Sequence, residues 1–138
     1  MSRTNIYIDI DGVLLANEFS LAEGAVEFIK HIGDNFTVYW LTTHCMHGNP
    51  GWAIEYVDRA SEEDLTPWLN KFIPTEWSMM KTEAIDFDQP FFWFDDDCYT
   101  AEKKELAKNK TLRSWMEVDL SKHPDQLIHE LKFLKSLD

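Results

Sequence analysis

Two aspartates, Asp9 and Asp11, stand two residues apart at the end of an apolar run, in the segment IYIDIDGVL. At the end of a strand, residues two apart project toward the same side, and Gly12 permits a sharp turn directly after them. Adjacent carboxylates repel each other, and a hard dication with oxygen ligands relieves that repulsion. The pair indicates a metal site or, in the simpler interpretation, two solvated loop residues.

A second acidic cluster follows another apolar run, in FFWFDDDC, which contains Asp95, Asp96 and Asp97. Three adjacent negative charges after a buried strand are costly unless water or a metal ion solvates them. A solvated acidic turn is the alternative for this segment alone. A fold that brings both strand ends to one edge of a sheet would join the two clusters in one metal site.

Hydroxyl and amino groups accompany the carboxylates. Thr42 and Thr43 follow the apolar run VYWL, and a hydroxyl there can donate a hydrogen bond to a phosphoryl oxygen or cap the next turn. Lys81 lies at the start of a helix-like segment, where the helix dipole disfavours a cation. Neutralisation of a phosphate or of a carboxylate would explain this lysine, although a solvated surface lysine is the simpler interpretation.

The pattern of apolar residues predicts the elements that position these side chains. Strands are predicted over 5–10, 36–42, 90–94 and 113–120. Helices are predicted over 20–35, 52–60, 61–72, 100–109 and 123–137, with a short helical turn over 81–86. Ser20 and Ser61 are the expected N-caps of the first and third helices, and Gly33 is the expected end of the first.

This alternation predicts an α/β fold: a Rossmann-like, three-layer α/β/α arrangement with a mostly parallel sheet, in one domain over residues 1–138. Ligands of such sheets bind beyond the carboxyl ends of the strands, which is where the aspartates and threonines stand. Residues 44–80 are expected to form a small helical insert near the site. Its aromatic and histidine residues are candidates for substrate contact or, more simply, for packing: His44, His47, Trp52 and Trp68.

Taken in order, these segments resemble the motifs of the haloacid dehalogenase (HAD) superfamily, most of whose members are phosphatases. The strand followed by D-x-D-G-[TV] matches Asp9 to Val13 without departure. The hydroxyl, lysine and acidic motifs match Thr42 (with Thr43 as its rival), Lys81, and Asp95 with Asp96. The resemblance covers nearly the whole chain and implies a HAD-like fold.

The resemblance also implies a Mg²⁺-dependent phosphohydrolase that acts on a phosphate monoester through an aspartyl-phosphate intermediate. Asp9 would attack phosphorus as the nucleophile, and Asp11 would act as general acid and then as general base. Thr42 and Lys81 would orient the phosphoryl group and neutralise its charge.

The same resemblance implies how the metal is held. Mg²⁺ would bind the Asp9 carboxylate, the backbone carbonyl of Asp11 and one aspartate of the acidic run. Asp96 is favoured as the direct ligand, with Asp95 acting through water, but the run of three leaves this register open. The further candidates for substrate contact are Gly12, Thr43 and His44.

Many members of this superfamily carry a cap domain over the site, but segments 12–41 and 44–80 have room only for short elements. An open site without a large cap is therefore expected. A phosphotransferase on the same scaffold is one alternative, although a cap that excludes water would then be expected. A non-catalytic binding or regulatory module is another, against which the intact pair of Asp9 and Asp11 argues. Dehalogenation needs no metal and would leave the second acidic cluster without a purpose.

The composition of the chain limits the classes of substrate and partner that are expected. The chain of 138 residues carries a formal charge of −12, which repels nucleic-acid backbones, so a phosphorylated small molecule or a phosphoprotein is the expected substrate. No apolar run approaches the roughly 20 residues of a membrane span, and the first residues lack a signal peptide's apolar stretch. A cytoplasmic protein without a membrane partner is expected, and a homo-oligomer is compatible with the sequence. The two cysteines form no disulfide framework, and the spacing in HCMH does not favour zinc.

Overall fold

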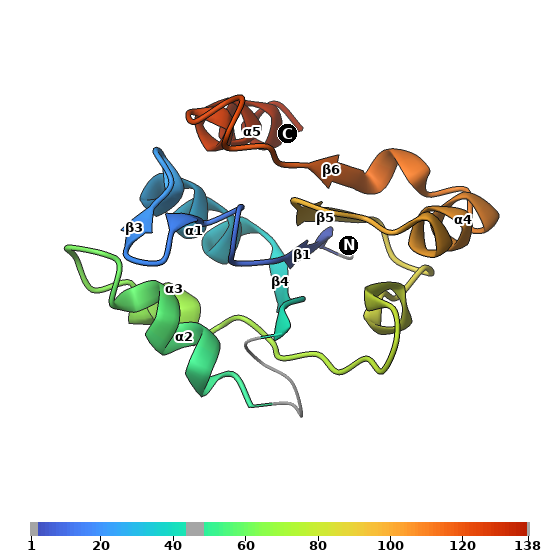
Figure 1. Cartoon of the computed structure of the whole chain (residues 1–138), viewed down its shortest axis with the longest axis horizontal. Helices are drawn as coiled ribbons and strands as arrows, with labels where there is room; N and C mark the ends of the chain where they lie inside the picture. Colours follow the sequence, from blue (N-terminus) through green and yellow to red (C-terminus); the bar gives the residue numbers. More distant parts are fainter. Residues whose placement is uncertain (1–2, 44–48, 138) are drawn as a thin grey trace.

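A four-stranded parallel sheet lies at the centre of the computed structural model, which describes residues 3–43 and 49–137 (Figure 1). The strands lie in the order β4–β1–β5–β6, and each neighbouring pair is parallel. Their bounds are Asn5–Ile8 for β1, Thr37–Trp40 for β4, Phe91–Asp95 for β5 and Trp115–Glu117 for β6. The fold is α/β with a parallel sheet, as the alternation of elements predicted.

Helices cover both faces of this sheet, because β1 is buried on both sides and needs apolar partners on each. Ile6 and Ile8 face a core shared with four helices: α1 (Ala25–Asn35), α2 (Gly51–Asp58), α3 (Thr66–Leu69) and α5 (Gln126–Lys135). Tyr7 faces a smaller core shared with α4 (Thr100–Lys108) and the 3₁₀ turn η2 (Lys81–Ala84). Figure 1 shows the two groups on opposite sides of the strands. This arrangement is compatible with a Rossmann-like α/β/α fold.

Most helices agree with the periodicity of the sequence. The bounds are Gly51–Asp58 for α2, Lys81–Ala84 for η2, Thr100–Lys108 for α4 and Gln126–Lys135 for α5. Strand β6 is shorter than the expected 113–120, because a 3₁₀ turn, η3 (Leu112–Ser114), precedes it. The side chain of Gln126 then bonds the backbone carbonyl of Glu117 at 2.7 Å and the N–H of Asp119 at 2.8 Å, so neither group is left for a strand partner.

A hairpin that the sequence analysis missed precedes the first helix. β2 (Leu15–Asn17) pairs antiparallel with β3 (Ser20–Leu21), and α1 covers Ala25–Asn35. The expectation that Ser20 caps this helix is therefore wrong. Gly24 takes the N-cap position instead with a φ of 81°, a left-handed conformation that glycine adopts at little cost.

The expected end of α1 at Gly33 is also wrong, because the helix continues to Asn35. Gly33 is buried, and a Cβ at this position would lie 3.1 Å from the side chain of Trp68. This glycine therefore permits the close approach of the segment that carries α3 (Thr66–Leu69) rather than stopping the helix.

The helix expected over 61–72 is mostly wrong, since only α3 is helical there. The Ser61 hydroxyl and the Asp64 carboxylate each accept a bond from the backbone N–H two residues further along. Such bonds compete with helix formation, so the residues before Thr66 form turns. Pro67 lies in the first turn of α3, where proline is tolerated.

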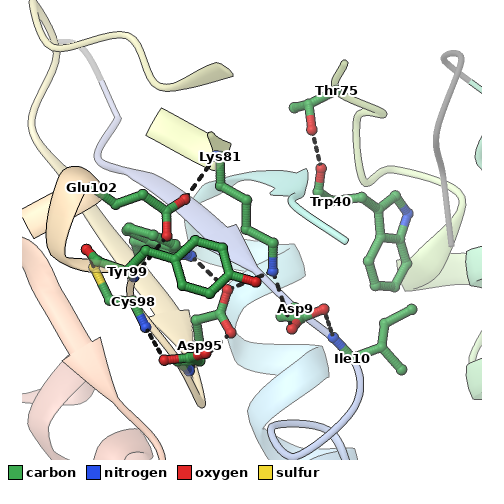
Figure 2. A network of polar contacts seen from close by, with 11 residues as sticks. Asp9, Ile10, Trp40, Thr75, Lys81, Asp95, Cys98, Tyr99 and Glu102 are labelled. Carbon is green, nitrogen blue, oxygen red and sulfur yellow. Dashed lines mark hydrogen bonds and ion pairs between the residues drawn. The ribbon is translucent and has the colours of Figure 1, made fainter. Parts of the chain in front are cut away.

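The described part of the insert, 49–80, holds two short helices, as expected, and then returns to the sheet. Ile73 runs beside β4: its N–H donates to Val38 at 2.9 Å, and its carbonyl accepts the N–H of Trp40 at 2.8 Å. The Thr75 hydroxyl donates to the carbonyl of Trp40 at 2.5 Å (Figure 2). Among the described residues, no helix has the length and apolar character to cross a membrane.

Shortening a side chain in the larger core is expected to destabilise the fold. Phe28 of α1 is fully buried and meets Phe94 of β5 edge-on, with ring centroids 5.4 Å apart. Phe28→Ala should lower the free energy of unfolding by about 3–5 kcal/mol, measured by urea denaturation. Phe19→Ala is the control, because Phe19 is 72% exposed and should cost less than about 1 kcal/mol. Equal losses would contradict the assigned packing.

Candidate functional site

The register of β1 and β5 places two aspartates beside each other. Ile8 pairs with Phe94, and the N–H of Asp9 donates to the Phe94 carbonyl at 3.1 Å. The next residues along the two strands, Asp9 and Asp95, are therefore neighbours. Side chains alternate between the two faces of a sheet, and Asp9 and Asp95 each stand two residues after an aromatic residue of the smaller core. Both aspartates therefore belong to the face that η2 and α4 cover.

These strand ends lie where the chain changes its direction across the sheet. From β1 the chain moves to β4 on one side, and it later returns to β5 on the other side of β1. Ligands of open α/β sheets bind beyond the carboxyl ends of the strands at such a switch point. The fold thus places both aspartates where ligand binding is expected.

Lys81 joins the two aspartates (Figure 2). Its ammonium nitrogen lies 3.2 Å from Oδ2 of Asp9 and 2.6 Å from Oδ2 of Asp95. Burial acts to lower the pKa of Lys81, but the charges of Asp9 and Asp95 outweigh it and raise the pKa. Lys81 is therefore a cation. It lies against carboxylates, which is one of the two roles that would explain a lysine at the start of a helical segment.

One ammonium group cannot neutralise two carboxylates. Asp95 is almost fully buried, and the indole N–H of Trp93 donates to its Oδ2 at 3.2 Å. Burial, followed by the charge of Asp9, raises the pKa of Asp95 to about 8, although Lys81 acts in the opposite direction. The site consequently holds surplus negative charge that a proton or a metal ion can offset.

Asp96 completes a group of three carboxylates. One oxygen from each of Asp9, Asp95 and Asp96 lies within 4.8 Å of the other two, which is close enough to share a metal ion. Gly12 makes room for this approach: its φ is 76°, and a Cβ there would lie 2.5 Å from Oδ2 of Asp96. Asp9 of the first acidic cluster thus meets Asp95 and Asp96 of the second, and these three aspartates could hold a metal.

Asp11 faces a different neighbour. Its Oδ1 accepts a hydrogen bond from the hydroxyl of Tyr56 in α2 at 3.2 Å. The guanidinium of Arg59 lies over the Tyr56 ring, 4.6 Å from its centroid. Desolvation and then the charge of Asp11 raise the pKa of Tyr56, which keeps the phenol protonated as the donor. The insert therefore contacts the site through Tyr56, a residue that the sequence analysis did not single out.

The two threonine candidates for contact with the phosphoryl group have different positions. Thr43 is exposed and lines the same pocket as Asp9, whereas Thr42 is fully buried and is not among the lining residues. His44 lies outside the described residues, as do Cys45 and His47. The position of Thr43 makes it the stronger candidate of the two threonines for a ligand in this pocket.

Glu102 is the buried residue that the sequence analysis missed. Its Oε2 accepts the backbone N–H of Lys81 at 2.8 Å, and its Oε1 accepts the N–H of Tyr99 at 2.9 Å (Figure 2). Glu102 thereby joins the start of η2 to the start of α4. A glutamate three residues after a helix start is a capping signal, so the segment YTAE could have revealed this residue.

The pocket at this edge has a volume of about 310 Å³. Its lining includes Lys81 and the three aspartates, together with Trp77, Met79 and Tyr99. Cys98 lies nearby, but burial and then the charge of Glu102 raise the pKa of its thiol to about 12. The thiol is therefore protonated at neutral pH, in agreement with a packing role rather than a reactive or zinc-binding one.

Comparisons of the chain with protein-family models, with curated proteins and with solved structures returned no match in any of the three. The chemistry of the site therefore has to be inferred from its own residues. A buried cation between two carboxylates, beside a group of three aspartates that could hold a metal, offers the charges needed to bind an anionic group.

Protein without a metal ion is expected to lose stability as the pH rises from 6 to 8. The pKa of Asp95 is about 8 in the folded chain and 3.8 ordinarily, so the folded state holds this proton more tightly. That advantage is complete below the ordinary pKa and disappears as the pH passes the folded pKa. The expected loss between pH 6 and pH 8 is about 2 kcal/mol, measured by urea denaturation in EDTA.

Asp95→Asn is the matched control for this experiment, because an amide does not titrate. Its free energy of unfolding should change less than that of the wild type between the two pH values. The same change in both proteins would assign the pH dependence to other groups of this acidic chain.

Proposed function

We propose that this chain is a Mg²⁺-dependent phosphohydrolase that cleaves a phosphate monoester through an aspartyl-phosphate on Asp9. The observation that carries the proposal is the ammonium group of Lys81 between Asp9 and Asp95 at the switch point of the sheet. A carboxylate next to a buried cation can approach a phosphoryl group, whose negative charge would otherwise repel it.

The order of the motifs along the chain supports the same proposal. The segments that resemble those of the HAD superfamily are far apart in sequence, yet Asp9, Lys81 and Asp95 lie within contact distance of one another. Asp96 belongs to the same carboxylate group. A membership in that superfamily, with a site free of a large cap domain, is part of the proposal.

The residues present fit Mg²⁺, which prefers carboxylate oxygens and often binds through one or two of them. Asp9, Asp95 and Asp96 would hold the ion, and the surplus negative charge around buried Asp95 gives a physical reason for it. When bound, Mg²⁺ would withdraw charge from the phosphoryl oxygens. Lys81 would neutralise part of the same charge.

The reaction would have two steps on this chain's own residues. In the first, a carboxylate oxygen of Asp9 attacks phosphorus, the bond from phosphorus to the alcohol oxygen breaks, and Asp11 gives that oxygen its proton. In the second, Asp11 takes a proton from water as the water oxygen attacks phosphorus. The bond between phosphorus and Asp9 then breaks, which releases phosphate and restores both aspartates.

Water access favours hydrolysis over transfer to a second substrate. Thr43 and Asp96, which line the pocket, are both exposed. The described part of the insert contributes two short helices and no domain that could exclude solvent. An aspartyl-phosphate in this pocket would therefore meet water readily.

Removal of the nucleophile is expected to abolish turnover. Asp9→Asn keeps the size of the side chain but weakens its attack on phosphorus, so kcat should fall at least about 1,000-fold. The measurement is release of p-nitrophenol from p-nitrophenyl phosphate with Mg²⁺ and with EDTA. The control is Asp88→Asn, which changes an exposed aspartate outside the pocket and should retain wild-type turnover. Turnover that persists in Asp9→Asn would contradict the assigned nucleophile.

Binding of Mg²⁺ is expected to depend on Asp96 and not on its neighbour Asp97. Asp96→Asn should weaken the affinity at least about tenfold in calorimetric titration, because one oxygen of Asp96 belongs to the carboxylate group. Asp97 lies outside that group, and its Oδ1 accepts the N–H of Cys98 at 2.8 Å. Asp97→Asn is therefore the matched control within the acidic run. The reverse order of the two effects would show that the register of the ligands is wrong.

A further inference from the structure

Three large apolar or aromatic side chains line the pocket beside its charged groups. Trp77, Met79 and Tyr99 line it together with the aspartates, and we refer to these three residues as the apolar rim. Met79 is 83% exposed and Tyr99 is 63% exposed. Large apolar side chains gathered at one opening are a typical sign of a surface that a ligand covers.

Carboxylates hold the backbone under this rim in place. Glu83 accepts the backbone N–H groups of Ser78, Met79 and Met80 at 2.9 to 3.0 Å. These three bonds lower the pKa of Glu83, which keeps it ionised and strengthens it as an acceptor. The backbone that presents Met79 is therefore ordered although its side chain projects into solvent.

The other side of the rim is held in the same way. The backbone N–H of Tyr99 donates to buried Glu102, which also accepts the N–H of Lys81. The ring of Trp77 is also coupled to the site, because the ammonium of Lys81 lies 5.9 Å from its centroid. A surface whose backbone is ordered before binding loses less entropy when a ligand covers it.

The charged groups of the pocket lining limit the kind of substrate group that the apolar rim can bind. Among the described residues that line the pocket, Lys81 is the one cation, and it already forms ion pairs with Asp9 and Asp95. The other charged groups of the lining are the carboxylates of Asp96, Asp97 and Glu102. The part of a substrate beyond its phosphate therefore meets apolar surface and negative charge, which suits an uncharged group.

We propose that the substrate is a phosphate monoester whose alcohol carries an uncharged planar aromatic ring, which packs on Tyr99 and Met79 while the phosphate lies at Asp9. This inference rests on the proposed function and names the substrate class of the same site. A ring has a face for stacking on Tyr99 and an edge for contact with the sulfur of Met79. The pocket volume of about 310 Å³ is at the small end for ligand sites and suits a phosphate with a compact ring system.

Two matched pairs of phosphate esters test whether the substrate carries an aromatic ring. They also show whether the ring lies next to the ester or beyond a sugar. Benzyl phosphate and ethyl phosphate have similar leaving groups and differ by a ring next to the ester. Adenosine 5′-monophosphate and ribose 5-phosphate share a primary alcohol and differ by a ring beyond a sugar. In at least one pair, the ester with the ring should have a kcat/KM about tenfold higher or more.

Variants of the apolar rim should reduce that preference. Tyr99→Ala and Met79→Ala should each lower the preference about threefold or more, whereas Tyr99→Phe should retain it because the ring face remains. In the two alanine variants, the kcat/KM of the ester without a ring should fall by a smaller factor than that of the ester with the ring. Leu112→Ala is the control, since Leu112 is an exposed apolar residue outside the pocket.

The outcomes separate this inference from the proposed function. No turnover of any of the four esters would overturn the proposed function, and this inference with it. Turnover without a preference for the ring in either pair would overturn this inference alone. The same would follow if Tyr99→Ala lowered the kcat/KM of both members of a pair equally, because the tyrosine would then act on the common part of the substrates.

Discussion

The ammonium group of Lys81 lies between the carboxylates of Asp9 and Asp95, and the arrangement of the site depends on this contact. Without a cation, the register of β1 and β5 would place two negative charges side by side in a largely buried position. With one cation, a surplus of negative charge remains, which raises the pKa of Asp95 and provides a reason to bind a metal ion. The repulsion between the two aspartates is thus both the structural problem and the source of the proposed chemistry.

The path of the chain explains how Lys81 reaches this place. After β4 the chain leaves the sheet, forms α2 and α3, and returns beside β4 through Ile73. It then crosses to the other face of the sheet, where η2 carries Lys81 to the aspartates and Glu102 of α4 fixes its backbone. The same stretch carries Trp77 and Met79, so one excursion of the chain supplies both the cation and part of the apolar rim.

Expectations from the sequence succeeded where one local signal was strong and failed where a distant contact decided. Strands such as β5 have short runs of apolar and aromatic residues, which strongly favour a buried strand. Ser20 had every local feature of a helix N-cap, yet it pairs in a hairpin. Gly33 had the feature of a helix end, yet it lies inside α1, where it permits the close approach of Trp68. Capping signals are local, and a tertiary contact of similar energy can override them.

The sequence by itself determined the alternation of strands and helices, the α/β class, and the two aspartate clusters at strand ends, because apolar periodicity and residue type are local properties. The tertiary structure decided which of those groups meet. It brought Asp9, Asp95, Asp96 and Lys81 together, set Asp11 against Tyr56, and placed Thr43 rather than Thr42 at the pocket. These outcomes depend on strand register and on the return of a long insert, and both are settled by packing between residues that are distant in the chain.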